Sequence, residues 1–313
     1  MEAVNVGTDA VGVDVNPLAC LISRVKTRPL SPAFSQDAST VISNARQRLT
    51  DNDVEIPDIP NLDHWFGPIV QLELAAIVSE IKKVQQMESR EALEVTFSRI
   101  VTDVSFQESD TRYAAVAKKT VLGGVLHAFR RSADFIERAF SSTSQSKLFG
   151  KRAEAVVLNR DTLTLTKDDL RKQVGIVVTS PPYPNAYEYW LYHKYRMYWL
   201  GMDPIKAKHS EIGARPHYFK ANAESEIDFE QKMRICFDFL AQVMSLSAKA
   251  CFIMSDSIIR GKVVDNADLL TRAAKHARFG RTGFAPREIP THRRSFNVHR
   301  GRQREYLMVF TRS

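Results

Sequence analysis

The chain has 313 residues, of which 44% are hydrophobic, and a formal net charge of +8. This length and apolar content suffice to bury a full core in one large or two modest domains, which excludes a disordered chain. The sequence has no apolar run that could span a bilayer and no signal-peptide core, and its three scattered cysteines (Cys20, Cys236 and Cys251) favour a reducing cytoplasm over a disulfide framework or a zinc site.

Residues 10–19 are predicted to pass from a short apolar strand into a helix. The strand ends at Asp14, and Asn16 and Pro17 are a suitable N-cap and first helical residue. Apolar residues then recur at helical spacing: Leu18, Leu21, Ile22 and Val25. An acid between strand and helix is typical of the second βα unit of a nucleoside-binding Rossmann-like sheet, where the carboxylate binds the ribose hydroxyls. Taken alone, Asp14 fits a simple helix-capping role equally well.

The following part of the chain is predicted to be mostly helical. Residues 28–60 are polar and contain prolines, which indicates a long connection with one short helix over 41–49. Residues 65–140 have helical periodicity and are expected to form an α-helical insertion between the second and third strands. A polar segment, 104–113, interrupts these helices and fits either a substrate-base contact or an ordinary helix connection.

The α/β pattern resumes after residue 154. Residues 155–158 are predicted to form the third strand, and 174–178 a fully buried parallel strand that ends in Ser180-Pro181-Pro182-Tyr183. Two consecutive prolines fix φ and remove both main-chain donors, so this segment is a rigid hydrogen-bond acceptor. Pro-Pro-Tyr also occurs in ordinary turns, but ligands of open α/β sheets bind beyond the carboxyl ends of such strands.

The last third is predicted to complete the sheet. An aromatic-rich helix runs from Tyr187 to Trp199, with most of its rings in the core. A long helix over 229–246, a strand over 250–254, and a terminal antiparallel hairpin formed by strands around Glu288 and over 306–310 follow.

The positive charge is concentrated in the tail. From Thr271 onward there are eleven Lys and Arg residues against two acids, an excess larger than the formal charge of the whole chain. Arginines alternate there with aromatic and polar residues: Arg278, Arg281, Arg287, Arg293, Arg294, Arg300, Arg302 and Arg304. Such a one-sided cluster favours a nucleic-acid contact over a merely solvated face.

Together these segments resemble the family of DNA amino-methyltransferases, which modify cytosine N4 or adenine N6 with S-adenosylmethionine. In this family the tetrapeptide begins with Asp, Asn or Ser, and the Ser form is associated mainly with cytosine N4. Further stretches match the family pattern: 12–18, 192–201, 211–215, 293–297 and 304–305. The resemblance implies a site-specific DNA methyltransferase of a restriction-modification system, with DNA as its partner and a cognate restriction endonuclease as a possible second one.

The resemblance also implies the fold. We expect an α/β protein with a Rossmann-like methyltransferase sheet that lacks its first strand and carries an α-helical insertion. Residues 1–29 would begin the sheet, 30–150 would form the insertion, and 151–313 would form the catalytic part with a basic hairpin.

Family members begin with a strand and a Phe-x-Gly-x-Gly cofactor loop, whereas only residues 1–8 precede the second strand here. We rank three explanations: a start codon placed too late, a separate N-terminal polypeptide, and a decayed gene. The chain alone is then expected to bind S-adenosylmethionine poorly or not at all. The alternative function is a truncated, non-catalytic nucleic-acid-binding fragment or subunit that needs a separate cofactor-binding segment.

The resemblance assigns residue roles as well. Ser180, Pro181, Pro182 and Tyr183 would be catalytic, with Tyr183 stacking on a base flipped out of the duplex. S-adenosylmethionine would be held by Asp14, Asn16 and Asp161, although Asn159 takes the place of Asp161 in a shifted alignment. Nucleic acid would meet basic residues: Lys194, Arg196, Arg293, Arg294, Arg300 and Arg302. No metal is expected.

Two other chemistries are not supported by the sequence. No cysteine follows a proline as in a cytosine C5 nucleophile, and the acidic or histidine clusters of a metal nuclease are absent. Asp256, Asp265 and Asp268 are expected to cap or flank elements. An RNA methyltransferase is a lesser variant, because the Ser form favours DNA cytosine only by family habit.

Overall fold

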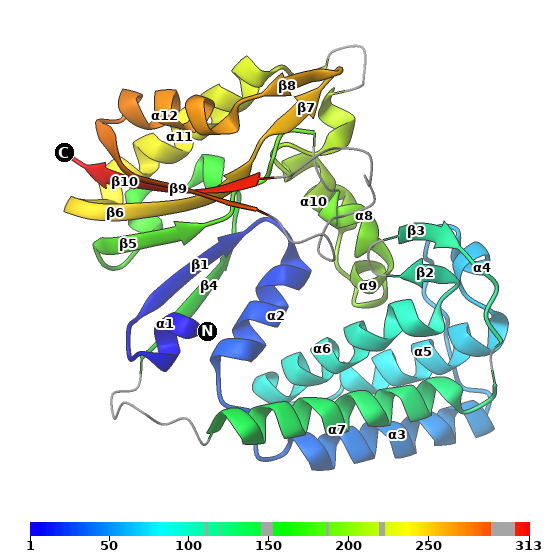
Figure 1. The fold of residues 1–313 in the computed structure, drawn as a ribbon. Helices are drawn as coiled ribbons and strands as arrows, with labels where there is room; N and C mark the ends of the chain where they lie inside the picture. The colour runs from blue at the N-terminus through cyan, green and yellow to red at the C-terminus, as the bar shows by residue number, and fades with distance from the viewer. Residues whose placement is uncertain (110–111, 120, 145–152, 186–187, 219–222, 289–303) are drawn as a thin grey trace. The chain divides into compact units, whose positions relative to one another are not determined.

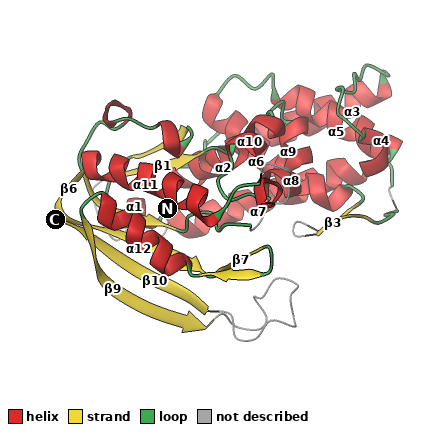
Figure 2. Ribbon diagram, turned by 90° about the horizontal axis from the view of Figure 1, so that it is seen from above, coloured by secondary structure: helices red, strands yellow, loops and turns green. Residues whose placement is uncertain are grey.

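A computed structural model describes residues 1–313 except 110–111, 120, 145–152, 186–187, 219–222 and 289–303. The chain divides into two compact units, and each is described by itself. The first comprises Met1–Asn159 with Tyr189–His209, and the second comprises Arg160–Glu188 with Ser210–Ser313. Both units contain helices and strands, so the expectation of a mixed α/β protein is confirmed (Figures 1 and 2).

The first unit begins with a small βα arrangement. After the short helix α1 (Glu2–Asn5), strand β1 (Ala10–Asp14) pairs in parallel with β4 (Ala155–Asn159). Helix α2 (Pro17–Thr27) starts where the sequence predicted, because the Asn16 side chain accepts hydrogen bonds from the amides of Leu18 at 2.9 Å and Ala19 at 3.4 Å. The predicted strand, cap and helix are thus confirmed.

Most of the first unit is a bundle of helices. They are α3 (Phe34–Thr50), α4 (Leu62–Trp65), α5 (Pro68–Ile81), α6 (Met87–Val104) and α7 (Gly124–Ser144). Helices α3, α5, α6 and α7 pack against one another, as Figure 1 shows. The polar segment between α6 and α7 contains a small hairpin of β2 (Gln107–Ser109) and β3 (Arg112–Ala115).

The short helix predicted over 41–49 is wrong in length. Helix α3 has seventeen residues and starts at Phe34, because its buried positions recur every three or four residues from its first turn: Phe34, Ala38, Val41, Ile42 and Ala45. The polar residues between them face solvent and hid this periodicity.

The aromatic segment forms two short helices rather than one. They are α8 (Tyr189–Tyr192) and α9 (Lys194–Trp199), followed by α10 (Pro204–Ser210). The chain leaves the helical conformation at His193, where φ is −105° and ψ is 6°. Trp190, Tyr195 and Trp199 are buried, and Tyr198 packs against the same core, so four of the six described rings belong to the core, as predicted.

The second unit is built on a four-stranded sheet in the order β5 (Val174–Thr179), β6 (Met244–Ser255), β10 (Arg304–Arg312) and β9 (Phe279–Glu288). β5 is parallel to β6, and β10 is antiparallel to both of its neighbours. The predicted terminal hairpin is confirmed, and its last strand lies between β6 and β9. The unit also has a hairpin of β7 (Ser257–Ile259) and β8 (Lys262–Val264) and three 3₁₀ turns (Thr162–Thr164, Lys167–Asp169 and Arg215–Tyr218).

Helices α11 (Glu226–Val243) and α12 (Asn266–His276) cover one face of this sheet (Figure 1). Phe237 of α11 stacks on Phe252 of β6, with 5.0 Å between ring centroids, and meets Phe310 of β10 at 5.4 Å. The predicted helix end at residue 246 is wrong, because β6 begins at Met244 and has twelve residues. Asp265 caps α12 by accepting from the Asp268 amide at 2.9 Å, as predicted.

Strand β5 differs from the fully buried strand that the sequence predicted. Ile176 is 59% exposed and Val178 is 70% exposed, although the strand is parallel to β6 as expected. Val177 points to the other face, where it packs on the core. Along the described residues, we find no helix with the length and apolar character to cross a membrane.

Candidate active site

The Ser180-Pro181-Pro182-Tyr183 segment follows the carboxyl end of β5 and folds back on itself. Pro181 is buried, Ser180 and Pro182 are exposed, and the Tyr183 ring is partly buried against the core of the second unit. Ser180 Oγ lies 3.4 Å from the Tyr183 hydroxyl, which also donates to the Ile253 carbonyl at 3.5 Å. The hydroxyl, both proline rings and the aromatic ring therefore belong to one loop anchored on β6.

Gly213 supports this loop from a distant part of the sequence. Its φ of +76° is a conformation that other residues rarely adopt. A Cβ atom on Gly213 would lie 2.8 Å from the Tyr183 carbonyl oxygen and 3.6 Å from Cβ of Pro182. We did not predict this residue as part of the site, although it lies within the family-like segment 211–215, and a glycine in such a segment was the available signal.

The residue after the loop is also held in place. Asn185 has a φ of +58°, and its Nδ2 donates to the Ile258 carbonyl at 2.5 Å. This bond connects the chain beyond the tetrapeptide to β7. The described part of the loop is therefore anchored at Tyr183 and at Asn185.

Asp14 lies at the carboxyl end of β1, in the first unit. Its Oδ1 accepts from the Asn16 amide at 2.8 Å. The residue is exposed to solvent, yet the surrounding protein atoms raise the pKa of its carboxyl by desolvation, against the Asn16 and Val15 amides, which favour the charged form. An exposed carboxylate at the end of a parallel strand has the chemistry needed to accept from sugar hydroxyls.

Asn159 and Asp161 form different hydrogen bonds. Asn159 belongs with Asp14, because its Nδ2 donates to the carbonyls of Asp14 and Val15, both at 3.0 Å. Asp161 belongs to the second unit and caps a 3₁₀ turn by accepting from the Leu163 amide at 2.9 Å. The Asn159 side chain thus binds main-chain carbonyls of the first unit. The Asp161 carboxylate caps the 3₁₀ turn that follows it.

Two predicted nucleic-acid contacts lie in the first unit and are engaged in packing. The Lys194 ammonium lies 5.4 Å from the Tyr195 ring and 5.8 Å from the Tyr198 ring. Burial, with a smaller contribution from Lys208, lowers the pKa of Lys194. Arg196 Nε donates to Thr102 Oγ1 at 3.2 Å.

The predicted tail contacts Arg293, Arg294, Arg300 and Arg302 lie outside the described residues. The tail arginines on β9 lie within the described residues. Arg281 lies over the Phe284 ring, 5.0 Å from its centroid, and Arg287 forms an ion pair of 2.6 Å with Glu305 of β10. Basic side chains therefore occupy the strand that leads to the predicted DNA-contacting segment.

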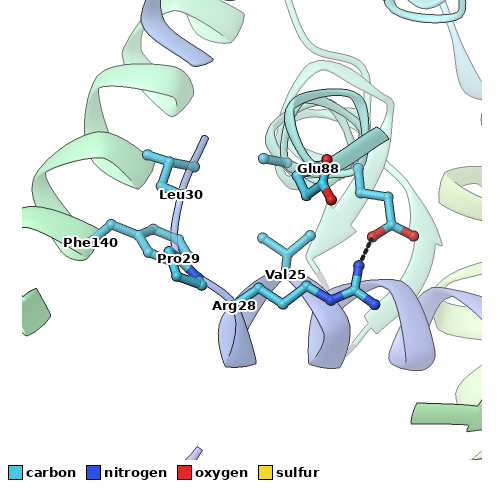
Figure 3. A pocket seen from close by; sticks show the side chains of 8 residues that line it. Val25, Arg28, Pro29, Leu30, Glu88 and Phe140 are labelled. Atoms are coloured by element: carbon cyan, nitrogen blue, oxygen red, sulfur yellow. Dashed lines mark hydrogen bonds and ion pairs between the residues drawn. The ribbon is translucent and has the colours of Figure 1, made fainter. Parts of the chain in front are cut away.

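A small pocket lies in the first unit (Figure 3). It is lined by Val25, Arg28, Pro29, Leu30, Glu88, Glu91, Ala92 and Phe140. Arg28 Nη1 and Glu91 Oε2 form an ion pair of 3.3 Å, and Glu91 also binds Arg24 at 2.7 Å. Because these charges neutralise one another, the pocket has the character of a packing feature, and none of the predicted site residues lines it.

The structure thus assembles two groups of predicted residues, one in each unit. Asp14, Asn16 and Asn159 meet at the end of the β1–β4 pair. Ser180 and Tyr183 meet at the end of β5, where Gly213 packs against the main chain of Tyr183.

Comparison with known proteins yields a distant similarity. The chain is 22% identical over 203 residues to the Type II methyltransferase M.MvaI from Kocuria varians. The matched region covers 59% of this chain and 44% of that protein, so the chain spans less than half the length of the relative. No family model matches the sequence. The similarity agrees with the methyltransferase resemblance of the tetrapeptide and extends over more than half of the chain.

Proposed function

We propose that this protein is a site-specific DNA methyltransferase that transfers a methyl group from S-adenosylmethionine to an exocyclic base amine, with cytosine N4 the favoured target. The observation that carries the proposal is the Ser180-Pro181-Pro182-Tyr183 loop at the carboxyl end of a parallel strand, with Gly213 packed behind its main chain. The distant similarity to a methyltransferase supports the same class.

The chemistry of the loop suits an amine substrate. An exocyclic amine is a weak nucleophile because its lone pair is delocalised into the base. The Pro181 carbonyl and the exposed Ser180 hydroxyl can accept hydrogen bonds from the amine hydrogens, which favours a pyramidal nitrogen with a directed lone pair. The prolines offer no competing donor. The Tyr183 ring, partly exposed, offers a stacking surface to a base that has left the duplex.

The fold of the second unit supports the family assignment. A methyltransferase sheet is expected to continue from a parallel strand that carries the tetrapeptide and to close with an antiparallel hairpin. The order β5, β6, β10, β9 has this form. In the first unit, the parallel β1–β4 pair has the form expected for the second and third strands.

S-adenosylmethionine is the proposed cofactor, and part of the residue set fits it. The exposed Asp14 carboxylate, beside the buried cap Asn16, suits the ribose hydroxyls, and the Asp161 carboxylate suits an amino group. When bound, this cofactor would supply a methyl group that is activated by its sulfonium. The sulfur would leave as a neutral thioether, which needs no acid catalysis. The role of this chain's residues is to bind the cofactor's ribose and to orient the amine.

A methylation assay with the chain supplemented by an N-terminal Phe-x-Gly-x-Gly segment, labelled S-adenosylmethionine and duplex DNA, followed by digestion to nucleosides, tests the proposal. We expect label on cytosine N4, and we expect Ser180→Ala and Tyr183→Ala each to reduce turnover by about a hundredfold. Tyr183→Phe keeps the ring and should lose less. Ser142→Ala, at an exposed serine of α7, is the matched control and should retain full turnover. Equal rates in all four variants would reject the assigned roles.

The second candidate is a non-catalytic DNA-binding subunit, and the exposed strand β5 favours it because an incompletely covered sheet is expected of an incomplete enzyme. Calorimetry on the chain with and without an added N-terminal Phe-x-Gly-x-Gly segment separates the two. Binding of S-adenosylmethionine that appears with the added segment would support the enzyme, whereas DNA binding without cofactor binding in both forms would support the subunit.

A further inference from the structure

The β7–β8 hairpin leaves the sheet of the second unit at the edge where the tetrapeptide lies. β5 and β6 are parallel, so their carboxyl ends share one edge of the sheet. Ser180 directly follows β5, and after β6 only Asp256 precedes the hairpin (Figure 1). All of these elements belong to the second unit, so their arrangement is that of one compact body.

The hairpin has a defined conformation. Its strands are joined by Arg260 and Gly261, whose φ values of +47° and +79° are typical of the tight two-residue turn that matches the twist of a hairpin. At its base, the buried Asn266 side chain donates to the Ser255 carbonyl and to Ser257 Oγ, both at 2.7 Å. The hairpin is therefore fixed to the end of β6.

The hairpin is also bonded to the chain that leaves the tetrapeptide. Asn185 Nδ2 donates to the Ile258 carbonyl of β7 at 2.5 Å, and the Tyr183 hydroxyl donates to the Ile253 carbonyl of β6 at 3.5 Å. The tetrapeptide loop and the hairpin thus share one support within the same unit. Their spacing is set by these bonds.

The hairpin carries only positive charge. Residues 257–264 contain Arg260 and Lys262 and no acid. Within the described part of the chain, no ion pair involves either side chain. The two acids at its base have other roles, because Asp256 accepts from the Tyr306 hydroxyl at 3.2 Å and Asp265 caps α12. The two cations at the turn are therefore not neutralised by the acids next to the hairpin.

We propose that the β7–β8 hairpin contacts duplex DNA beside the target base, with Arg260 and Lys262 on its phosphates. Phosphate is the ligand that paired cations without an acidic neighbour bind, and a two-stranded ribbon is one of the elements that the major groove admits. The inference rests on the proposed function, because DNA is the ligand in both. It adds a surface that is separate from the predicted tail contacts.

The bonds to Asn185 and Asn266 give this contact a purpose. Phosphate contacts fix the register and orientation of a protein on a duplex without reading its sequence. A hairpin at a set spacing from the tetrapeptide would hold the duplex where a flipped base reaches Ser180. The hairpin therefore contributes to DNA affinity and placement, and the choice of base is left to other residues.

Fluorescence anisotropy of the full chain with a labelled duplex at several salt concentrations tests the proposal. The double variant Arg260→Ala/Lys262→Ala should lower the slope of log affinity against log salt by about 1.8, because two phosphate contacts are lost. Its affinity at about 0.1 M salt should fall at least about tenfold. Arg260→Lys/Lys262→Arg keeps both charges and should bind nearly as the parent does.

The matched control is Arg171→Ala/Lys275→Ala, which removes the same charge from the same unit. Both residues are exposed. They lie toward the opposite edge of the sheet, since Arg171 precedes β5 and Lys275 is near the end of α12, just before β9 begins. The control should keep the slope of the parent. Circular dichroism shows whether each variant is folded.

Hydrogen exchange on the unmodified chain gives a second measurement. We expect the amides of residues 257–264 to become better protected when the duplex is added. An unchanged hairpin on DNA binding, an unchanged slope in Arg260→Ala/Lys262→Ala, or an equal loss in the control would overturn the proposal.

The methylation assay on the parent separates this inference from the proposed function. A parent that binds DNA and transfers no methyl group would count against the proposed function, while the slopes would still decide the role of the hairpin. A parent that methylates DNA, with a hairpin variant that keeps the slope, would reject the hairpin contact alone.

Discussion

Gly213 combines a left-handed backbone with close contact to the Tyr183 carbonyl, and the two features can be separated. Gly261 has a φ of +79°, but a Cβ there would meet nothing within 4 Å. Replacing either glycine by alanine should therefore carry the cost of a left-handed backbone. Only the replacement of Gly213 should also carry the cost of a steric clash.

We predict that Gly261→Ala lowers the free energy of unfolding by about 1 kcal/mol and leaves substrate binding intact. Gly213→Ala should lower it by about 1–3 kcal/mol more, because the tetrapeptide must shift. Urea denaturation measures both. If Gly213→Ala lowered the free energy of unfolding no more than Gly261→Ala does, the close packing behind Tyr183 would contribute nothing to stability.

At the scale of elements, a buried glutamate side chain binds the main-chain amides at the start of helix α7. Glu73, in the middle of α5, is completely buried and accepts from the amides of Gly123 at 2.5 Å, Val125 at 2.9 Å and Leu126 at 3.3 Å. These amides have no partner within their own helix, and an anion at a helix N-terminus is favoured by the helix dipole.

We therefore expect Glu73→Ala to destabilise the protein by about 2–4 kcal/mol, because two buried donors and one partly buried donor lose their acceptor. Glu73→Gln keeps one acceptor oxygen and should lose about half as much. Thermal unfolding measures the order, with the exposed Glu55→Ala as control. Equal stability of Glu73→Ala and Glu55→Ala would contradict this role of Glu73.

A second buried acid, Glu80 near the end of α5, links stability to pH. Burial alone would raise its pKa, but bonds from Lys83 at 2.5 Å, Asn44 at 3.2 Å and Arg48 at 3.4 Å outweigh burial and lower the pKa. A carboxyl whose folded pKa is depressed stabilises the protein above its unfolded pKa, and this contribution is lost as the pH falls through the folded value.

Glu80→Gln should therefore be less stable than the parent at neutral pH, and this difference should shrink as the solution is acidified below the ordinary pKa of a glutamate. Denaturation series at several pH values measure it. A difference that is constant with pH would show that the ion pairs are not its source.

At the scale of the whole molecule, the positive charge predicts DNA affinity that depends on salt. The formal charge is +8, and the C-terminal part is the most basic. Each phosphate contact contributes about 0.9 to the slope of log affinity against log salt. Replacing Arg293, Arg294, Arg300 and Arg302 by alanine should reduce this slope by about 3 to 4.

Fluorescence anisotropy with a labelled duplex at several salt concentrations measures the slope. The matched control replaces Arg46, Arg138, Arg171 and Arg215, which lie outside the tail, by alanine and makes the same change in net charge. If both quadruple variants lost the same slope, net charge alone would account for binding.

Several elements could be predicted from sequence because their signals are local. Asn16 and Pro17 define the start of α2. The tetrapeptide could be found for the same reason, since its chemistry lies in four consecutive residues. Helix α3 was underestimated because its polar face is long, and the aromatic helix was overestimated because no local signal marks the break at His193.

The sequence by itself determined the βα unit around Asp14, the strand that leads to Ser180, and the rigid acceptor that the two prolines form, since each depends on neighbours along the chain. Only the tertiary structure decided that β10 lies between β6 and β9, that Gly213 packs behind Tyr183, and that Ile176 and Val178 are exposed. These features arise from contacts between residues far apart in sequence. An apolar strand has the same composition whether a neighbour covers it or not, so the exposure of its side chains is known only from the tertiary structure.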